Sequence, residues 1–420
     1  MDNLFKERHI LCIDLKSFFA SCECVKKGVD PFNYPLVVAN PNQGDGAITL
    51  AVTPFLKKLG VKSRGRIFEI PKNIKYEIAM PHMNYYISKS KEVVSVYLDY
   101  VAKEDIHIYS IDECFLDVTS YLKLYQKTDY ELAKDILKKV YDKTGLTATC
   151  GIGPNMLLAK VSMDIEAKHN TDCISKWTYD DVPKKLWKIS PLSDMWGIGK
   201  NMEKRLNSMN IFTIEDLAKT NPGILKDKFG IIGIELWNHA NGIDKSEIKD
   251  FNNITKDKSY SNSQVLFKDY NEKNITIIIN EMIDNLCARL RKNNKECLTF
   301  GLGITYSKNT PGGFYHNVKL DNATDKMTDL IKYASIIFDR YYENLPIRKV
   351  TVCAGNLRNK LGTQLNLFEE YVDIKKEDNI NEVIDQIKKK YGKNSVLKAS
   401  SLLEDSTIKE RNNKVGGHNA

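Results

Sequence analysis

Three acidic residues in two distant segments are the side chains of this sequence best suited to catalysis. Asp14 follows Cys12-Ile13, and Asp112 and Glu113 follow Tyr109-Ser110-Ile111. The apolar neighbours predict strand ends, where carboxylates can converge while the strands stay buried. Carboxylates held together raise each other's pKa values, so we expect divalent cations between them. Oxygen ligands without histidine or cysteine suit two Mg²⁺ ions. The other interpretation is three acids solvated at loops.

The length and composition indicate several domains and no membrane span. At 420 residues the chain is too long for one ordinary domain. Hydrophobic residues make up 42%, enough for buried cores, and the net charge of +8 weakly favours a polyanionic partner. The nine cysteines lack zinc-type spacing, so reduced thiols are expected. We find no signal peptide and no apolar run long enough to cross a membrane.

Strand and helix patterns predict an α+β fold in several parts. The acids fall at the ends of buried strands expected near 9–13 and in a hairpin spanning 106–118. Further along we expect short helices over 173–247, a polar linker over 248–258 with little to bury, a second α+β module over 259–357, and a polar tail over 358–420 with one helix near 380–391.

Two phenylalanines follow the first acid at the start of an expected helix. Ser17 is a candidate N-cap, and the helix is expected to end at Gly28. Free N–H groups at its start could receive a triphosphate next to Phe18 and Phe19. The ring of Phe19 could lie under a sugar and leave no room for a 2′-hydroxyl. Two core aromatics on one helix face are the alternative.

A glycine turn between two short helices indicates a helix-hairpin-helix. The turn is Trp196-Gly197-Ile198-Gly199-Lys200. Glycines let the backbone approach a phosphate closely, and the next helix offers its amides. We therefore expect Gly197, Gly199 and Lys200 to bind the DNA backbone without reading bases. A plain connection between helices is the alternative.

Three ordered motifs carry a family resemblance over residues 9 to about 357. The motifs are Ile13–Glu23, Tyr109–Asp117 and Gly151–Lys160. They resemble those of the Y-family translesion DNA polymerases, most closely the UmuC-like bacterial branch that includes the catalytic subunit of DNA polymerase V. The resemblance implies a right-hand fold: a palm of residues 1–17 and 83–172, small fingers at 18–82, a helical thumb with the helix-hairpin-helix at 173–247, and a little finger at 259–357.

The resemblance also assigns roles at the acidic site. It implies that Asp14, Asp112 and Glu113 are the catalytic metal ligands for two Mg²⁺ ions, that Leu15 adds its backbone carbonyl, and that Phe19 is the steric gate for the sugar.

Three further residues resemble the nucleotide contacts of the family. Lys57 stands where the family places a phosphate contact, and Pro54 replaces a common tyrosine, so Thr53 is expected to supply a hydroxyl. Lys168 resembles a second phosphate lysine, with an offset of one residue. The alternative for each lysine is a solvated helix face.

The later segments and the family resemblance together predict two binding partners, DNA and the bacterial sliding clamp. In the little finger, Lys258, Ser259, Ser261, Ser263 and Arg348 are candidate contacts to the DNA backbone. The segment Gln364-Leu365-Asn366-Leu367-Phe368 resembles the pentapeptide that binds the bacterial sliding clamp. Its alternative is a strand that packs back on the fold.

These features together predict an error-prone translesion DNA polymerase, which joins a dNTP to a primer 3′-hydroxyl on primer-template DNA in DNA damage tolerance and SOS mutagenesis. We expect it in the cytoplasm, associated with the nucleoid. The sequence leaves open whether a processed regulatory subunit and a recombinase filament are needed. The alternatives are a two-metal DNA nuclease and a non-catalytic DNA-binding repair factor.

Overall fold

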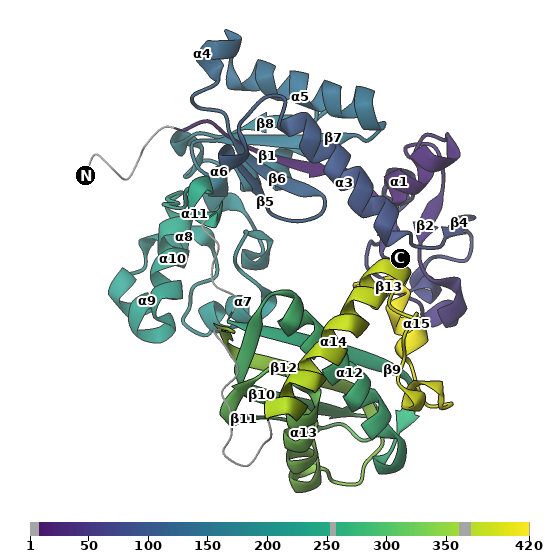
Figure 1. The fold of residues 1–420 in the computed structure, drawn as a ribbon. Helices are drawn as coiled ribbons and strands as arrows, with labels where there is room; N and C mark the ends of the chain where they lie inside the picture. The colour runs from purple at the N-terminus through teal and green to yellow at the C-terminus, as the bar shows by residue number, and fades with distance from the viewer. Residues whose placement is uncertain (1–7, 253–257, 361–370, 420) are drawn as a thin grey trace. The chain divides into compact units, whose positions relative to one another are not determined.

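The computed structural model describes residues 8–252, 258–360 and 371–419 (Figure 1). The chain forms two compact units, Met1–Ile254 and Thr255–Asn419. The boundary between them lies inside the expected linker at 248–258.

A five-stranded sheet is the centre of the first unit. Its order is β5-β6-β1-β7-β8, so β1 is the middle strand and runs antiparallel to both of its neighbours. The strands are β5 (Ile106–Ile108), β6 (Glu113–Asp117), β1 (Ile10–Leu15), β7 (Ala148–Gly153) and β8 (Ile174–Lys176). The hairpin expected around Asp112 and Glu113 is present as the antiparallel pair β5–β6.

The alternation of side chains along β1 and β6 decides which way the acids face. Leu11 and Ile13 belong to the core under α3 (Met83–Tyr97) and α5 (Asp129–Thr144). Ile10, Cys12 and Phe115 belong instead to the core under α6 (Met156–Ser162). Because alternate residues of a strand share a face, Asp14 and Glu113 lie on the α6 side of the sheet.

The helix α6 lies unusually close to the sheet because two glycines of β7 make room for it. A Cβ on Gly151 would come within 2.0 Å of the Ala159 carbonyl oxygen, and a Cβ on Gly153 within 2.4 Å of the Ala159 amide nitrogen. The Gly-Ile-Gly sequence therefore sets the distance between α6 and the acids.

The first unit also contains a smaller sheet and several short helices. The small sheet has the order β3-β2-β4 and its own core. Its strands are β2 (Leu36–Val38), β3 (Ala51–Val52) and β4 (Glu77–Ala79), with α1 (Phe18–Lys27) and α2 (Pro54–Lys58) next to them. The short helix α4 (Leu122–Tyr125) lies instead beside α5.

Short helices follow β8, which itself belongs to the central sheet although helices were expected from residue 173. They are α7 (Lys200–Asn207), α8 (Ile214–Lys219), α9 (Pro222–Phe229), α10 (Ile231–Ala240) and α11 (Ile248–Asn252). The helix α11 corrects the expectation of a linker beginning at residue 248. Ile248 is buried beneath the central sheet, and the ring of Phe251 stacks on His107 of β5 at 4.2 Å, so this segment has a hydrophobic partner.

The second unit is a four-stranded antiparallel sheet with two helices on one face. The sheet order is β11-β10-β12-β9. Apolar residues of α12 and α13 form one core with inward-facing residues of β10 and β12. The elements are β9 (Ser259–Tyr270), α12 (Glu272–Lys292), β10 (Lys295–Tyr306), β11 (Gly313–Thr324), α13 (Met327–Tyr341) and β12 (Ile347–Asn359).

The C-terminal segment is folded against the second unit, which corrects the expectation of a polar tail. It contains α14 (Tyr371–Tyr391), α15 (Ile408–Asn412), β13 (Lys414–Val415) and β14 (His418–Asn419). In Figure 1, α14 crosses α12, and Arg291 of α12 forms a two-pronged ion pair with Asp385 at 2.7 and 3.1 Å. Ile408 is 4% exposed. One helix near 380–391 was expected; its docking was not.

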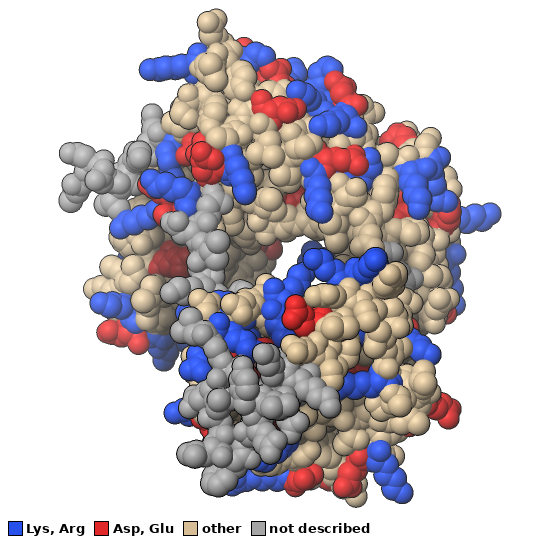
Figure 2. Space-filling view, viewed as in Figure 1, with Lys and Arg blue, Asp and Glu red and all other residues tan. Residues whose placement is uncertain are grey.

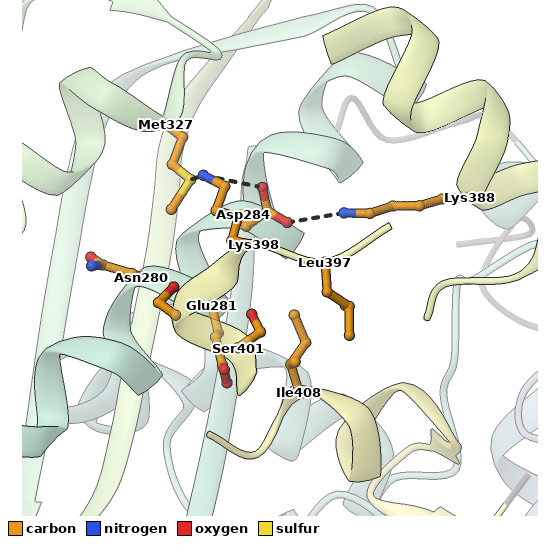
Figure 3. A pocket seen from close by; sticks show the side chains of 10 residues that line it. Asn280, Glu281, Asp284, Met327, Lys388, Leu397, Lys398, Ser401 and Ile408 are labelled. Carbon is orange, nitrogen blue, oxygen red and sulfur yellow. Dashed lines mark hydrogen bonds and ion pairs between the residues drawn. The ribbon is translucent and has the colours of Figure 1, made fainter. Parts of the chain in front are cut away.

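A small pocket marks the seam between this segment and α12. Lys388 and Lys398 approach Asp284 of α12 from two sides, at 3.2 and 3.9 Å (Figure 3). Nearby, Ser406 donates to the buried Glu281 at 2.5 Å. The C-terminal segment therefore supplies partners for two acidic side chains of α12.

The surface carries mixed charge. Basic and acidic side chains are interspersed on the visible face of each unit (Figure 2). Among the described helices, none is long and apolar enough to cross a membrane.

Candidate active site

Two of the three predicted acids are brought together by strand pairing. Asp14 and Glu113 are directly opposite each other in the β1–β6 ladder. The Leu15 amide donates to the Asp112 carbonyl at 2.9 Å, which ties the end of β1 to the acidic turn. Ser110 donates its hydroxyl to the Asp112 carboxylate at 2.6 Å. The two distant segments of sequence thus meet at one end of the central strand.

Two lysines of the α6 segment neutralise these acids. Lys160 lies 2.8 Å from Glu113, and both side chains are only 10% exposed. Lys168 lies 3.0 Å from Asp14 and is half-buried. Asp164 stands between the lysines, 3.1 Å from Lys160 and 2.7 Å from Lys168.

The environment of Asp14 makes its negative charge costly. The pKa of Asp14 is raised to about 6: burial raises it most, the nearby ammonium of Lys168 lowers it, and the charges of Asp112 and Glu113 also raise it. Burial disfavours the charged form of Lys168, yet Asp14 and Asp164 together hold its pKa above the ordinary value. The acids therefore repel one another, as the sequence predicted, and draw in a cation.

The acids suit a divalent cation by their chemistry but are not assembled as a ligand cage. Among the described residues, no group of three aspartate, glutamate, histidine or cysteine side chains is placed to hold a metal ion. Glu113 turns toward Lys160 and the Cys12 thiol, and Asp14 turns toward Lys168. The donors fit the predicted Mg²⁺ ions once the contact of Lys168 with Asp14 is exchanged for a metal ion.

A π-helical turn explains why Lys168 reaches the site. Residues Met163–Ala167 form this turn, and the Lys168 amide donates to the Met163 carbonyl five residues earlier. Eight residues of plain α-helix would place Lys168 about 80° around the axis from Lys160. A π turn absorbs one residue, which leaves the two lysines roughly 20° apart. The π turn therefore brings Lys160 and Lys168 to the same side of the helix.

The first helix places the predicted gate on an aromatic support. Phe18 is buried in the core at 3% exposure, so it is not open to a nucleotide. The Phe19 ring is partly buried and stacks on Tyr86 with 4.6 Å between centroids. Ser17 is not a capping residue: its φ is 49°, and its side chain makes no capping hydrogen bond.

Lys57 and Thr53, which lie beside the small sheet and were both expected to contact the triphosphate, differ in their exposure to solvent. Lys57 is solvent-accessible on α2 and near Asp14 and Asp112; partial desolvation lowers its pKa, while Asp14 opposes that effect. The prediction that the Thr53 hydroxyl contacts the triphosphate is wrong for this structure. It is fully buried, and its hydroxyl oxygen accepts from the Leu36 amide at 3.2 Å, so it does not face a nucleotide here.

The glycine turn adopts a backbone conformation that its glycines favour. Gly197 has a φ of 93°, a conformation that favours glycine. Gly199 directly precedes α7 and is exposed together with Lys200, and a Cβ added to Gly199 would meet no atom within 4 Å. The Trp196 indole donates to the Tyr109 hydroxyl at 3.2 Å, which anchors the hairpin beside the acidic turn.

Of the little-finger residues predicted to contact DNA, some side chains are exposed to solvent and others have partners within the unit. Ser259, Ser261 and Ser263 are exposed on the uncovered face of the sheet, where Ser263 pairs with Thr351 at 2.7 Å. The guanidinium of Arg348 already has partners within the unit: it donates to the Leu266 and Phe267 carbonyls and pairs with Asp269. Lys258 is exposed. The predicted clamp-binding residues Gln364, Leu365, Leu367 and Phe368 lie outside the described residues.

Three residues at the site received no role from the sequence. Lys160 was quoted within a motif, and Asp164 and Tyr86 were not singled out. A signal for Lys160 was present, because it is the one charged residue in the seven-residue helix Met156–Ser162, and every residue of that helix is buried. Asp164 follows four residues later, which is the spacing of an ion pair on a helix.

Comparison with known proteins places the whole chain in one family. The profile of the impB/mucB/samB family matches residues 13–164, that of its C-terminal domain matches 257–367, and that of the family's helix-hairpin-helix motif matches 179–211.

Relatives cover the chain nearly end to end. A Bacillus subtilis protein named as a UV-damage repair protein, UvrX, is 39% identical over 417 residues, covering 99% of this chain and 98% of the relative. The protein named DNA polymerase IV 2 of the same species is 32% identical, covering 99% of this chain and all of the relative. A solved Y-family DNA polymerase chimera of Dbh and Dpo4 matches with a TM-score of 0.65 and 21% identity, covering 84% of this chain and 99% of the chimera. The α+β right-hand fold is thereby confirmed.

Proposed function

Because the chain belongs to the impB/mucB/samB family of Y-family DNA polymerases, we propose that it extends a primer 3′-hydroxyl with dNTPs across damaged template bases. The relatives named for UV-damage repair and for DNA polymerase support this substrate class. The observation that carries the proposal is the pairing of Asp14 with Glu113 at the end of the central strand, directly before the helix that bears Phe19. In this proposal, the acids would bind the metal ions, the amides at the start of α1 would bind the triphosphate, and the Phe19 ring would face the sugar.

The acids would supply the reaction's negatively charged ligands. Asp14, Asp112, Glu113 and the Leu15 carbonyl would hold two Mg²⁺ ions, which when bound acidify the primer hydroxyl and neutralise charge on the leaving pyrophosphate. The chain's own part is to orient the acids: Ser110 fixes Asp112, and Lys160 fixes Glu113.

The cationic side chains would bind the triphosphate. Lys57 and Lys168 approach the acids from α2 and from the end of the π turn. Phosphate oxygens would compete with carboxylates for these ammonium groups, so both lysines would contribute to dNTP affinity.

Primer extension tests the proposal directly. The full-length protein with a primed template, dNTPs and Mg²⁺ should lengthen the primer, on damaged as well as undamaged template. The Asp112→Ala variant should show no extension while keeping DNA affinity. Shortening of the DNA in place of extension would favour the alternative of a two-metal nuclease. Wild-type behaviour of Asp112→Ala would favour a non-catalytic DNA-binding factor.

Sugar selection tests the role of Phe19. Its ring would block a 2′-hydroxyl, so Phe19→Ala should admit ribonucleotides and lower the ratio of deoxy to ribo incorporation by at least about tenfold. Phe32→Ala, which changes a phenylalanine of the same unit outside the helix α1, serves as the control. Unchanged selectivity in Phe19→Ala would remove the gate assignment and leave the polymerase assignment standing.

DNA would be held by backbone contacts on both units. The candidates are the exposed Gly197, Gly199 and Lys200 of the hairpin, and Ser259 and Ser261 of β9. Such contacts release counterions, so DNA affinity should fall steeply with salt. The sliding clamp, a processed regulatory subunit, a recombinase filament and a part in SOS mutagenesis belong to this proposal through the family alone.

A further inference from the structure

Five charged groups form a continuous chain between the central sheet and the helix α6. In order, they are Glu113, Lys160, Asp164, Lys168 and Asp14, joined by contacts of 2.8, 3.1, 2.7 and 3.0 Å. Each ammonium group therefore lies between two carboxylates. The two outer carboxylates are assigned as metal ligands in the proposed function, whereas the central one is not.

Lys160 and Lys168 differ in how readily each ammonium group could separate from its carboxylate partner. Lys160 and Glu113 are both 10% exposed, so separating them would leave a buried charge without compensation. Lys168 is 38% exposed and already has a second partner in Asp164. Breaking the contact with Asp14 would cost Lys168 one of its two ion pairs and leave the other in place.

We propose that Lys168 is the resident counter-ion of Asp14, which a divalent cation must displace, and that Asp164 is the positioning residue that retains the displaced ammonium beside the site. The proposal rests on the proposed function in taking Asp14 as a metal ligand. Lys168 lies 3.0 Å from one carboxylate oxygen of Asp14, so a metal ion that binds through this oxygen must displace the ammonium group. The π turn is the element that gives Lys168 this reach.

Manganese binding to the full-length protein, without DNA or nucleotide, tests the proposal. Free Mn²⁺ is measured by its electron paramagnetic resonance signal. Lys168→Gln removes the competitor and should bind Mn²⁺ about two- to fivefold more tightly, the range expected for loss of a partly exposed ion pair. Asp164→Asn leaves Lys168 paired with Asp14 alone and should bind Mn²⁺ more weakly than wild type.

Two controls separate direct competition from a general change in charge. Lys185→Gln removes a lysine of similar exposure, 37%, whose partners are Glu166 and Asp181, and should leave Mn²⁺ affinity unchanged. Lys57→Gln removes a positive charge that acts on the same acids from α2, and should raise affinity less than Lys168→Gln, whose ammonium is in direct contact with Asp14. Circular dichroism confirms that each variant is folded.

The outcomes distinguish this inference from the proposed function. Equal affinities of wild type and Lys168→Gln, or equal gains in Lys168→Gln and Lys57→Gln, overturn the counter-ion role. Tighter binding in Asp164→Asn overturns the positioning role. Failure of wild type and Lys168→Gln alike to bind Mn²⁺, while primer extension persists, overturns the assignment of Asp14 as the metal ligand and this proposal with it.

Discussion

Replacing Lys160 with methionine should destabilise the first unit, because the change leaves a buried carboxylate without its cation. Lys160 contacts both oxygens of Glu113, at 2.8 and 2.9 Å, and each side chain is 10% exposed. Removing one partner of a buried ion pair costs about 3–5 kcal/mol. The Cys12 thiol remains 3.2 Å from Glu113 but is a weak donor, so we expect a loss of about 3 kcal/mol in the free energy of unfolding.

Tryptophan fluorescence during urea unfolding measures this loss in the relevant unit. All four tryptophans belong to the first unit: Trp177, Trp187, Trp196 and Trp237. The urea midpoint should fall while the slope of the transition is retained. A loss below about 1 kcal/mol in Lys160→Met would refute the reasoning, since that is the size expected for a surface pair.

Two further variants give the measurement its controls. Lys185→Met breaks a pair with Glu166 in which both side chains are about one-third exposed, so it should cost less than about 1 kcal/mol. The double variant Lys160→Met with Glu113→Gln should recover part of the stability, because a neutral amide replaces the stranded carboxylate. If the double variant is no more stable than Lys160→Met, the loss comes from packing and not from the buried charge.

Three other predictions concern pH, the C-terminal segment and the clamp. Because burial raises the pKa of Asp14 to about 6, Mn²⁺ affinity should fall as the pH drops below that value and the carboxylate takes up a proton. An affinity that stays the same through this pH range would contradict the assignment of Asp14 as a metal ligand. Ile408→Ala should weaken docking of the C-terminal segment by about 2 kcal/mol, seen as faster hydrogen exchange over residues 399–412, and unchanged exchange would show that the buried side chain does not hold the segment. Replacing Leu367 and Phe368 with alanine should abolish stimulation by a bacterial sliding clamp while unassisted synthesis continues; loss of both would mean that the motif belongs to the fold.

Local pattern was sufficient to predict the elements that carry the acids. A strand ending near Asp14 and a hairpin around Asp112 and Glu113 both follow from short-range periodicity, because buried strands repeat their apolar residues at fixed spacing. The structure has them as β1 and β5–β6. Membership of the family is confirmed by the profile matches and the end-to-end relatives.

Long-range packing explains the predictions that were wrong. The C-terminal segment looked like a polar tail because its apolar residues are sparse, yet Asp385 finds Arg291 94 residues earlier in the chain. The start of the expected linker is likewise a helix, because Phe251 stacks on His107. Arg348 and Thr53 have hydrogen-bonding capacity in the sequence, but partners within the fold already use it. No local pattern reveals such distant partners.

The sequence by itself determined the kinds of groups at the site and the order in which the chain presents them. It placed three carboxylates at strand ends, an aromatic pair after the first, and lysines on neighbouring helices. Only the tertiary structure decided which ammonium meets which carboxylate. The reason is the rotation of side chains around a helix axis, since one extra residue turns a side chain by about 100°. The π turn brings Lys168 to Asp14. The close approach of α6 over Gly151 and Gly153 brings Lys160 to Glu113.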